Sequence, residues 1–461
     1  MRGEANAATL PATAPPRRVL PILLVAYAAF YLCRANIEPA LNLLAIEYGY
    51  DNEQLGVVMG IALGVYAFGK VVFGPLADVL GGKRILVAAL FGTALVSLAI
   101  AVSNAPRTFG PSMGLVVVGS LVVANRFVQA GGWGGLVDVV GATFEASRRG
   151  TIMGILSTSY DVGNVLALVL SAGIVHLGAG WRALFVVNPA IVLVVAVVVR
   201  AALPADRPRG RRREKSSTTE NRAAPLATIV LRLARQRALW FATGLSFLLT
   251  FVRAGFMTWT PRFLYEVSVA ANAASPTSSS IAKSAFFGVA GIVGSVVTGR
   301  ISDRLGPGRR APVMATSLAL LLACTLGLAH AGVRSPLVAT LGVAACGLFL
   351  LGPYSLLAGA VSLDVAEAAS AAGLAARAGP PPGAEGEADA SRGAASAAGF
   401  IDAVGYVGAS LAALVLGSVS KRAGWTAAFD VVAGVTFLAL LLALAWGTRQ
   451  ASPKPARSTS T

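Results

Sequence analysis

Apolar runs long enough to cross a bilayer recur along almost the whole chain. A helix needs about 20 apolar residues to span a hydrocarbon core of roughly 30 Å. Twelve runs approach or exceed this length, near residues 19–44, 55–77, 85–103, 112–138, 151–175, 181–203, 238–260, 282–302, 312–331, 337–363, 395–419 and 425–447. Of the 461 residues, 56% are apolar and 13% are charged. Because backbone polar groups in lipid must be paired within the spanning structure, the sequence predicts an all-α integral membrane protein with twelve transmembrane helices.

Positive charge is distributed unevenly among the loops that join these runs. The net charge of +17 could by itself indicate a nucleic-acid partner. The basic residues gather, however, in every second loop, at Arg17-Arg18, Lys83-Arg84, Arg148-Arg149, Arg207–Arg213 and Arg309-Arg310. The other loops are nearly bare, apart from single arginines and the pair Lys421-Arg422. By the positive-inside rule we expect both termini to lie in the cytoplasm. The chain is then expected in a cell (inner or plasma) membrane, and its basic charge is explained without a nucleic-acid partner.

Two polar stretches divide the chain. Residues 204–237 are interpreted as a basic cytoplasmic linker between an N-terminal six-helix bundle, 1–203, and a C-terminal one, 238–450. Residues 370–394, with Gly-Pro-Pro-Pro-Gly and alternating alanine and acidic residues, are predicted to form a disordered cytoplasmic insert. Residues 451–461 form a tail. The three cysteines lie within apolar runs and are odd in number, so no disulfide framework is indicated.

One loop motif occurs in both halves. The pattern G-x-x-x-D-x-x-G, followed by basic residues, begins at Gly74 after the second run and at Gly299 after the eighth. Its repetition indicates duplicated halves, an architecture in which transporters bind substrate at the interface. The motif resembles the loop signature of the major facilitator superfamily, which implies two pseudo-symmetric six-helix bundles. We expect its residues to control opening on the cytoplasmic side: Gly74, Asp78, Arg84, Gly299, Asp303 and Arg304.

Two arginines lie within apolar runs, Arg34 in the first and Arg253 in the seventh. A charge at the centre of such a helix costs roughly 2.5–3.5 kcal/mol on insertion scales, so its presence needs a reason. The two residues occupy similar places in the two halves. A guanidinium also presents a planar fork of donors that fits phosphate or carboxylate. The sequence therefore predicts an anion held by both arginines.

Polar side chains accompany these arginines at helical spacing. Tyr27, Tyr31 and Arg34 stand at i, i+4 and i+7, so a continuous helix would place them on one face. Tyr66 and Lys70 have the i, i+4 relation in the second run. Hydroxyls and cations on one stripe are suited to an anion-binding wall, although Lys70 could equally extend to a lipid headgroup.

Four segments resemble the organophosphate:phosphate antiporters of the major facilitator superfamily: residues 31–36, 251–267, 290–303 and 398–408. The similarity extends through nearly all twelve runs and fails in the linker, the insert and the tails. It implies that the phosphoryl group is bound by Arg34 and Arg253. It further implies a pocket that includes Tyr27, Tyr31, Tyr66, Lys70 and Tyr406.

The chain departs from that family at several pocket positions. Tyr160, followed by Asp161, stands where the glycerol-3-phosphate members carry a pocket histidine, and two expected acidic residues are absent. Asp402 is an additional acid in the eleventh run. It is interpreted either as a ligand of substrate hydroxyls or as a charge partner of Lys70 or an arginine. These departures leave the organic part of the substrate open.

A third arginine, Arg126, lies within an apolar run and begins the sequence Arg-Phe-Val-Gln-Ala-Gly-Gly. This sequence resembles the R-x-x-Q-G-x-G signature of proton-coupled members of the superfamily, which implies a part in proton movement. Alternatively, Arg126 pairs with Asp161 or another buried acid and stabilises the bundle. We favour the structural role, because a buried arginine more often finds a protein partner.

Together these features predict a secondary active transporter that exchanges an organic phosphate for inorganic phosphate by alternating access, as a monomer without cofactor or metal. A proton-coupled symporter of a carboxylate, such as a sugar acid, would use the same arginines with Arg126, Asp161 or Asp402 titrating. A non-transporting phosphate-ester sensor is a third interpretation, supported only by the insert at 370–394. An enzyme is least expected, because no nucleotide-binding loop and no metal or nucleophile cluster accompanies the two histidines.

Overall fold

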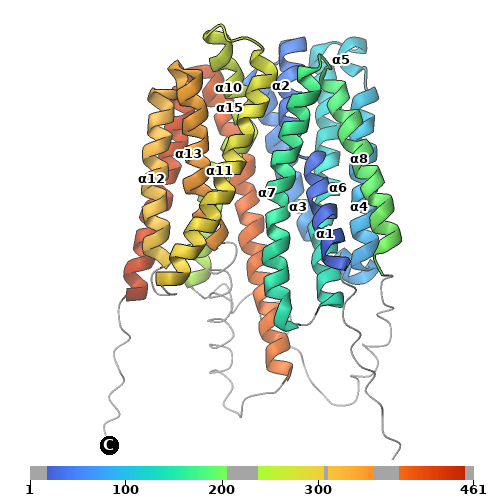
Figure 1. The fold of residues 1–461 in the computed structure, drawn as a ribbon, viewed down its shortest axis with the longest axis vertical. Coiled ribbons are helices and arrows are strands. Elements are labelled where there is room, and N and C mark those ends of the chain that lie inside the picture. The colour runs from blue at the N-terminus through green and yellow to red at the C-terminus, as the bar shows by residue number, and fades with distance from the viewer. Residues whose placement is uncertain (1–17, 145, 205–236, 306–309, 358–383, 452–461) are drawn as a thin grey trace, which may run out of the picture.

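The computed structural model describes residues 18–144, 146–204, 237–305, 310–357 and 384–451. Within these ranges all regular structure is helical, and most helices stand side by side along one direction (Figure 1). The elements are α1 (Val19–Leu32), α2 (Ile37–Tyr48), α3 (Asn52–Leu80), α4 (Gly82–Val102), α5 (Ala105–Thr108), α6 (Pro111–Thr143), α7 (Ala146–His176), α8 (Trp181–Ala202), α10 (Arg237–Ala270), α11 (Pro276–Leu305), α12 (Arg310–His330), η3 (Gly332–Arg334), α13 (Pro336–Leu356) and α15 (Ala384–Ala451). The all-α fold predicted from the apolar runs is confirmed.

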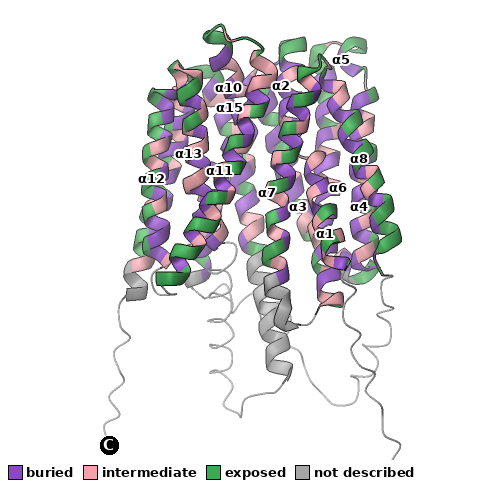
Figure 2. Cartoon of the chain, in the orientation of Figure 1, coloured by how far each residue is buried: buried purple, intermediate pink, exposed green. Residues whose placement is uncertain are grey.

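The outward faces of the helices are strongly apolar. Phe68, Val194 and Leu341 are each more than 60% exposed, and buried residues lie on the faces that helices turn to one another (Figure 2). A continuous apolar surface of this kind would drive association in water, whereas the hydrocarbon of a bilayer solvates it. The described residues contain eleven helical segments long and apolar enough to cross a membrane.

The last of these candidate spans, Phe400–Gly447, consists of two helical arms. A single helix of its 48 residues would be about 72 Å long, more than twice the thickness of a hydrocarbon core of roughly 30 Å. The backbone leaves the helical region at Gly424, with φ 79° and ψ 177°, a conformation that glycine adopts without steric cost. The predicted runs 395–419 and 425–447 correspond to the two arms, and their count as separate spans remains a prediction.

The first span is interrupted. Helix α1 ends at Leu32 and α2 begins at Ile37, and Arg34 lies in the connection between them. The prediction that Arg34 continues the helical stripe of Tyr27 and Tyr31 was therefore wrong. The physical reason is that side chains of α6 bind the backbone carbonyls of this connection, which makes a break in the helix tolerable inside the membrane.

The predicted insert at 370–394 falls only partly on described residues. Positions up to 383 lie outside them, as does almost all of the linker at 204–237. Helix α15 begins at Ala384, so the last part of the insert is helical and the prediction of disorder was wrong for it. Alanine and glutamate, which alternate there, are among the stronger helix formers. The domain boundaries remain predictions.

Two seams join the first half of the chain, α1–α8, to the second half, α10–α15. At one seam α3 packs closely on α15, and a Cβ atom placed on Gly417 would lie 3.0 Å from the Cα of Gly56. At the other, α7 packs on α11, and a Cβ atom on Gly288 would lie 2.9 Å from Val165. Small residues at both seams let the helices approach each other closely.

Candidate functional site

A cavity lies between the two halves, and the space free of protein atoms there is about 750 Å³, including the part that is open to solvent. Its wall is formed by the connection between α1 and α2 and by parts of α1, α2, α3, α6, α7, α10, α11 and α15. Four lining side chains carry a formal charge: Arg34, Glu38, Arg126 and Arg253. The remainder combines hydroxyl, amide, aromatic and aliphatic groups. A few converging charges in an otherwise apolar wall are typical of a small-molecule site.

Arg34 enters this cavity from the α1–α2 connection. Its guanidinium donates a hydrogen bond of 3.3 Å to the hydroxyl of Tyr406 and lies 4.2 Å from the ring centroid of Tyr66. A third ring, that of Tyr31, lies 5.2 Å away. Among the described residues no carboxylate lies within ion-pair distance of Arg34. Aromatic faces attract the cation without neutralising it, so its charge stays free to bind an anion.

Arg253 enters the same cavity from α10, in the other half. It donates a hydrogen bond of 3.3 Å to the hydroxyl of Tyr354, and its guanidinium lies 4.9 Å from the ring centroid of Tyr160. Only 9% of the residue is exposed, and its Nε finds no partner in the part of the chain that the structure describes. No described carboxylate lies within ion-pair distance of it either. Tyr354 was missed from the sequence, where a tyrosine in the tenth apolar run has no distinguishing spacing.

The predicted tyrosines separate into two groups. Tyr31 and Tyr406 line the cavity, and the ring centroids of Tyr31 and Tyr160 are 5.8 Å apart, so these rings connect the surroundings of the two arginines. Tyr27 does not line the cavity. It packs instead between Tyr31 and Trp133, with centroid distances of 5.8 and 5.1 Å. Its contribution is to the shape of the wall.

Lys70 and Asp402 form an ion pair that links α3 to α15. The Nζ of Lys70 lies 4.5 Å from the ring centroid of Tyr406, the residue that also accepts a hydrogen bond from Arg34. Neither member of the pair is among the residues that line the cavity. The side chain of Asp402 is 41% exposed and that of Lys70 18%. Of the two interpretations of Asp402, the geometry favours the charge partner.

Arg126 has an acidic partner, as the structural interpretation required, and the partner is Glu38. Its Nη2 lies 2.9 Å from Oε1 of Glu38, and Arg126 is 1% exposed. Asp161 makes no ion pair with any described residue and does not line the cavity, although its neighbour Tyr160 contacts Arg253. Glu38 was missed from the sequence, although it lies inside the first apolar run.

A comparison with protein families agrees with the helices, the duplicated loop motif and the cavity between the halves. The model of the Major Facilitator Superfamily matches residues 23–379. The chain belongs to this superfamily. The resemblance seen in the loop motif is thereby confirmed.

Named relatives within the superfamily are similar to the chain along most of its length. It is 28% identical to the putative glycerol-3-phosphate transporter 1 of Arabidopsis thaliana, over 84% of this chain and 73% of the relative. It is 25% identical to the glycerol-3-phosphate transporter of Bacillus subtilis, covering 92% and 91% of the two chains. The probable hexose phosphate transport protein of Chlamydia pneumoniae is also 25% identical, over 96% and 92%.

Solved structures of transporters share the fold. A bacterial homologue of the human lysosomal transporter Spinster, in an inward-facing and occupied conformation, has a TM-score of 0.68 at 13% identity and covers 95% of this chain and 98% of its own. The nucleoside transporter NupG, as its D323A mutant, has a TM-score of 0.67 at 14% identity and covers 92% and 99%. At these identities the likeness concerns the fold alone.

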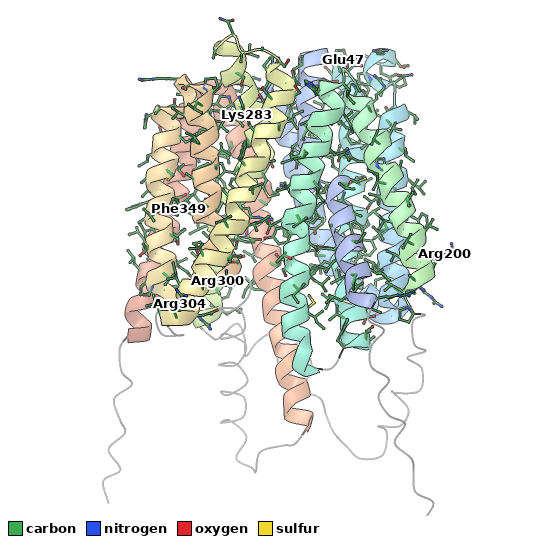
Figure 3. All side chains as sticks on the ribbon, in the orientation of Figure 1. Glu47, Arg200, Lys283, Arg300, Arg304 and Phe349 are labelled. Atoms are coloured by element: carbon green, nitrogen blue, oxygen red, sulfur yellow. The ribbon has the colours of Figure 1, made fainter. Side chains whose placement is uncertain are left out.

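The loop motif of this superfamily member lies at the lower end of the bundle in Figure 3, which labels Arg304 there. Asp303 and Arg304 are exposed, and a Cβ atom on Gly74 or Gly299 would meet no atom within 4 Å. The side chain of Asp78 lies outside the described set. The gating role of Gly74, Asp78, Gly299, Asp303 and Arg304 remains a prediction, as does that of Arg84.

A polar cluster joins the halves at the upper end, where Figure 3 labels Glu47. Arg262 of α10 donates to Oδ1 of Asn42 and of Asn52, both at 3.1 Å, and to Glu266 at 2.6 Å. Asn52 donates to Glu266 at 3.4 Å and to Ser420 at 3.2 Å. The indole N–H of Trp425 also donates to Glu266, at 2.6 Å. We call these residues the upper cluster: Asn42, Asn52, Arg262, Glu266, Ser420 and Trp425.

Ion pairs add to this closure. Glu53 lies 3.1 Å from Lys421 and 2.7 Å from Arg422, and Asp51 lies 2.8 Å from Lys421. Burial alone would raise the pKa of Asp51, but hydrogen bonds from Lys421 and from the backbone N–H of Gln54 outweigh it and hold that pKa below its usual 3.8. The sequence contained a signal for these pairs, because Lys421-Arg422 is a basic pair in an otherwise sparsely charged set of loops.

A smaller cavity lies between the main cavity and the upper cluster. It shares Glu38 and Thr258 with the main cavity and reaches Arg262. A path from the main cavity to the upper end would pass through this space. Two members of the upper cluster, Asn42 and Arg262, form part of its wall.

Proposed function

We propose that this superfamily member exchanges an organic phosphate for inorganic phosphate across a membrane by alternating access. The observation that carries the proposal is that Arg34 and Arg253 enter one cavity from opposite halves, and no described carboxylate lies within ion-pair distance of either. Each guanidinium can bind phosphoryl oxygens through two parallel hydrogen bonds. The names of the relatives, glycerol-3-phosphate and hexose phosphate transporters, support a phosphate ester as the organic substrate.

A dianion bound by both arginines would couple substrate binding to movement of the halves. In an empty cavity the two positive charges repel each other across the interface, whereas a shared anion attracts both. Such a ligand stabilises the arrangements in which Arg34 and Arg253 approach each other, and it can shift the equilibrium only by this difference in affinity. Switching would then be fast with a bound anion and slow without one, which gives exchange without ATP.

We assign the upper end of the bundle to the outside of the cell and the termini to the cytoplasm, following the distribution of basic residues in the loops. On this assignment the upper cluster and the pairs around Glu53 hold the protein closed toward the outside. The transporter would function as a monomer, because the cavity is assembled within one chain.

Replacing Arg34 or Arg253 by lysine tests the anion site. Lysine keeps the charge but removes the bidentate fork, so exchange of labelled phosphate in proteoliposomes preloaded with phosphate should fall by more than tenfold, about 1.4 kcal/mol. Arg182→Lys is the matched control, because Arg182 binds Asn104 at the upper end, away from the cavity. Normal exchange by both cavity variants would show that these arginines are structural.

A proton-coupled symporter of an organic carboxylate is the second candidate, and the observation in its favour is Glu38. This acid lines the cavity next to Arg126, where a proton-accepting group could respond to the substrate. An imposed pH gradient distinguishes the two functions. It should drive net uptake by a symporter into vesicles without internal phosphate, whereas an obligatory exchanger should show no uptake under this condition.

A further inference from the structure

The connection between α1 and α2 carries Arg34 into the cavity with an irregular backbone. The N–H of Ala35 makes the regular helical bond to the carbonyl of Tyr31, at 2.8 Å, but the N–H of Arg34 binds the same carbonyl at 3.1 Å, one residue short of the helical pattern. From the backbone of the described residues, the carbonyl of Arg34 receives one long bond of 3.4 Å, from the N–H of Ile37. Irregular backbone at membrane depth persists only where the protein supplies partners for the freed polar groups. The partners of this connection therefore determine whether Arg34 has a fixed direction.

Two side chains of α6 supply these partners. Nη2 of Arg126 donates to the carbonyl of Arg34 at 3.2 Å, and Nε2 of Gln129 donates to the carbonyl of Cys33 at 3.0 Å. Arg126 and Gln129 stand at i and i+3, so they share one face of the helix. They are only 1% and 4% exposed, so water does not compete for either bond.

The two donors are themselves held in place. Gln129 also donates to Oδ1 of Asn125 at 2.5 Å, and the amide of Asn125 binds the carbonyl of Thr93 at 3.0 Å and the hydroxyl of Ser97 at 2.9 Å. Asn125, Thr93 and Ser97 are completely buried. The chain of bonds runs from α4 through α6 to the connection, all within the first half. A group supported in this way loses little freedom when the site binds a ligand.

Glu38 completes the arrangement by pairing with Arg126 at 2.9 Å. The pair is neutral in total, so Arg126 can lie beside Arg34 without adding a net charge to the site. An isolated buried arginine would be strongly unfavourable, whereas a paired and hydrogen-bonded one is tolerated. Arg126 thus contributes geometry to the site, while the charge that faces the anion is that of Arg34.

We propose that Arg126 and Gln129 are positioning residues, which bind the carbonyls of Arg34 and Cys33 and thereby fix the direction in which the Arg34 guanidinium enters the cavity. This role deepens the proposed function, because it takes Arg34 as a ligand of the phosphoryl group. It differs from proton transfer, in which Arg126 would act through a change of its charge partner. It also differs from direct anion binding by Arg126, whose Nε and Nη1 have no partner among the described residues.

Thiol labelling of Cys33 tests the geometry without any assumption about substrate. Cys33 and Cys346 are both 0% exposed, one in the connection and one in the other half, and Cys324→Ala removes the third cysteine. In this background Gln129→Met removes the donor to Cys33 at nearly constant volume. The rate of Cys33 labelling should rise at least tenfold relative to that of Cys346. Thr93→Val is the control, because the Thr93 hydroxyl makes no bond among the described residues and only its carbonyl serves the network.

The ratio of the two labelling rates makes the result decisive even if a variant is partly unfolded, because general unfolding raises both rates. Arg126→Lys repeats the test. It keeps a positive charge beside Glu38 but removes the guanidinium, which binds both Glu38 and the carbonyl of Arg34. An increased ratio in Gln129→Met and Arg126→Lys, with Thr93→Val unchanged, supports the positioning role. An unchanged ratio in both Gln129→Met and Arg126→Lys, or an equal increase in the control Thr93→Val, overturns it.

Transport kinetics then separate positioning from proton transfer, while the Cys33 labelling ratio separates it from direct anion binding. In Arg126→Lys the phosphate concentration for half-maximal exchange should rise about tenfold, the maximal rate should stay within twofold, and the pH profile should not move. A shifted pH profile with a lower maximal rate and unchanged half-saturation would instead establish proton transfer and overturn the proposal. If the unaltered protein exchanges no phosphate, the proposed function fails. The labelling ratio still decides whether Arg126 and Gln129 hold the connection in place.

Discussion

The upper cluster should control how often the cavity opens toward the upper end, and Asn52→Ala provides the most direct test. Asn52 accepts a hydrogen bond from Arg262 and donates to Glu266 and Ser420. All three partners belong to the second half, whereas Asn52 begins α3 in the first. These bonds exist only while the halves are together at this end. Their loss should favour the arrangement that is open there.

The size of the effect follows from what remains after the substitution. A neutral hydrogen bond contributes about 0.5–1.5 kcal/mol net, and one to a charged group about 1.5–3 kcal/mol. Arg262 would still bind Asn42 and Glu266, and the hydroxyl of Ser420 would still bind the carbonyl of Gly417, so no charge loses its last partner. The low end of the sum is about 3.5 kcal/mol for two bonds to charged groups and one neutral bond. Because every partner keeps another bond, we expect a smaller loss, about 2 kcal/mol, which changes the ratio of closed to open protein about 30-fold.

A cysteine placed below the cluster reports this ratio. Met59 is 1% exposed and lines the smaller cavity, so Met59→Cys, in a variant with the three natural cysteines replaced, should react with an impermeant thiol reagent only when the upper end opens. Asn52→Ala should raise that rate about 30-fold in intact cells. Asn104→Ala is the matched control, because Asn104 accepts its bond from Arg182 within the same half.

Two outcomes would refute the reasoning. If Asn52→Ala reaches the membrane normally and Met59→Cys reacts no faster, the cluster does not hold the closed arrangement. If Asn104→Ala raises the rate as much as Asn52→Ala does, the loss of any asparagine at this end loosens the structure, and bonds across the seam have no special role.

Three further predictions concern the charged groups. Asp402→Asn leaves the half-buried Lys70 without its acid, so phosphate-for-phosphate exchange and organic phosphate uptake should both slow at least tenfold in paired assays. Loss of organic phosphate uptake alone would mean that Asp402 contacts hydroxyls. Glu53→Lys places a like charge opposite Lys421 and should increase labelling of the cavity from outside. Adding Lys421→Glu should reverse part of this increase. An additive effect of the two substitutions would exclude a direct pair. Because the pKa of Asp51 is lowered, its contribution to closure is complete above its usual 3.8 and is lost only as pH falls through the lower value in the folded state; labelling relative to an exposed reference cysteine should therefore be constant between pH 7 and 5, and a rise in that window would contradict the assignment.

The helices were predictable because a membrane span depends on a sum over about 20 residues, and no single position decides it. The break at Arg34 was not predictable in this way. The sequence Tyr-Leu-Cys-Arg-Ala-Asn contains neither glycine nor proline, the residues that usually interrupt a helix. The donors that make the break tolerable, Gln129 and Arg126, stand 96 and 92 residues from the carbonyls that they bind. Only the packing of α6 on this connection brings them together.

The candidate site shows the same division between composition and pairing. The types of side chain could be read from the sequence, since charged residues within apolar runs are rare and stand out. Their partners could not, because each bond crosses a large sequence distance: 332 residues for Lys70 and Asp402, and 214 for Asn52 and Glu266. Glu266 shows this clearly, because its i, i+4 relation to Arg262 was visible while its link to the other half was not.

Pairing also decides which charges are available to a substrate. Four cations lie in or beside the cavity, and from the sequence each of them could have bound an anion. The structure gives Lys70 and Arg126 acidic partners, Asp402 and Glu38. Arg34 and Arg253 have hydroxyls and aromatic rings instead. If the proposed exchange is right, the two arginines without an ion pair among the described residues would match a phosphate dianion. The acids Asp402 and Glu38 would then set the strength of anion binding by pairing with the other two cations, and this would explain why a site for an anion contains carboxylates at all.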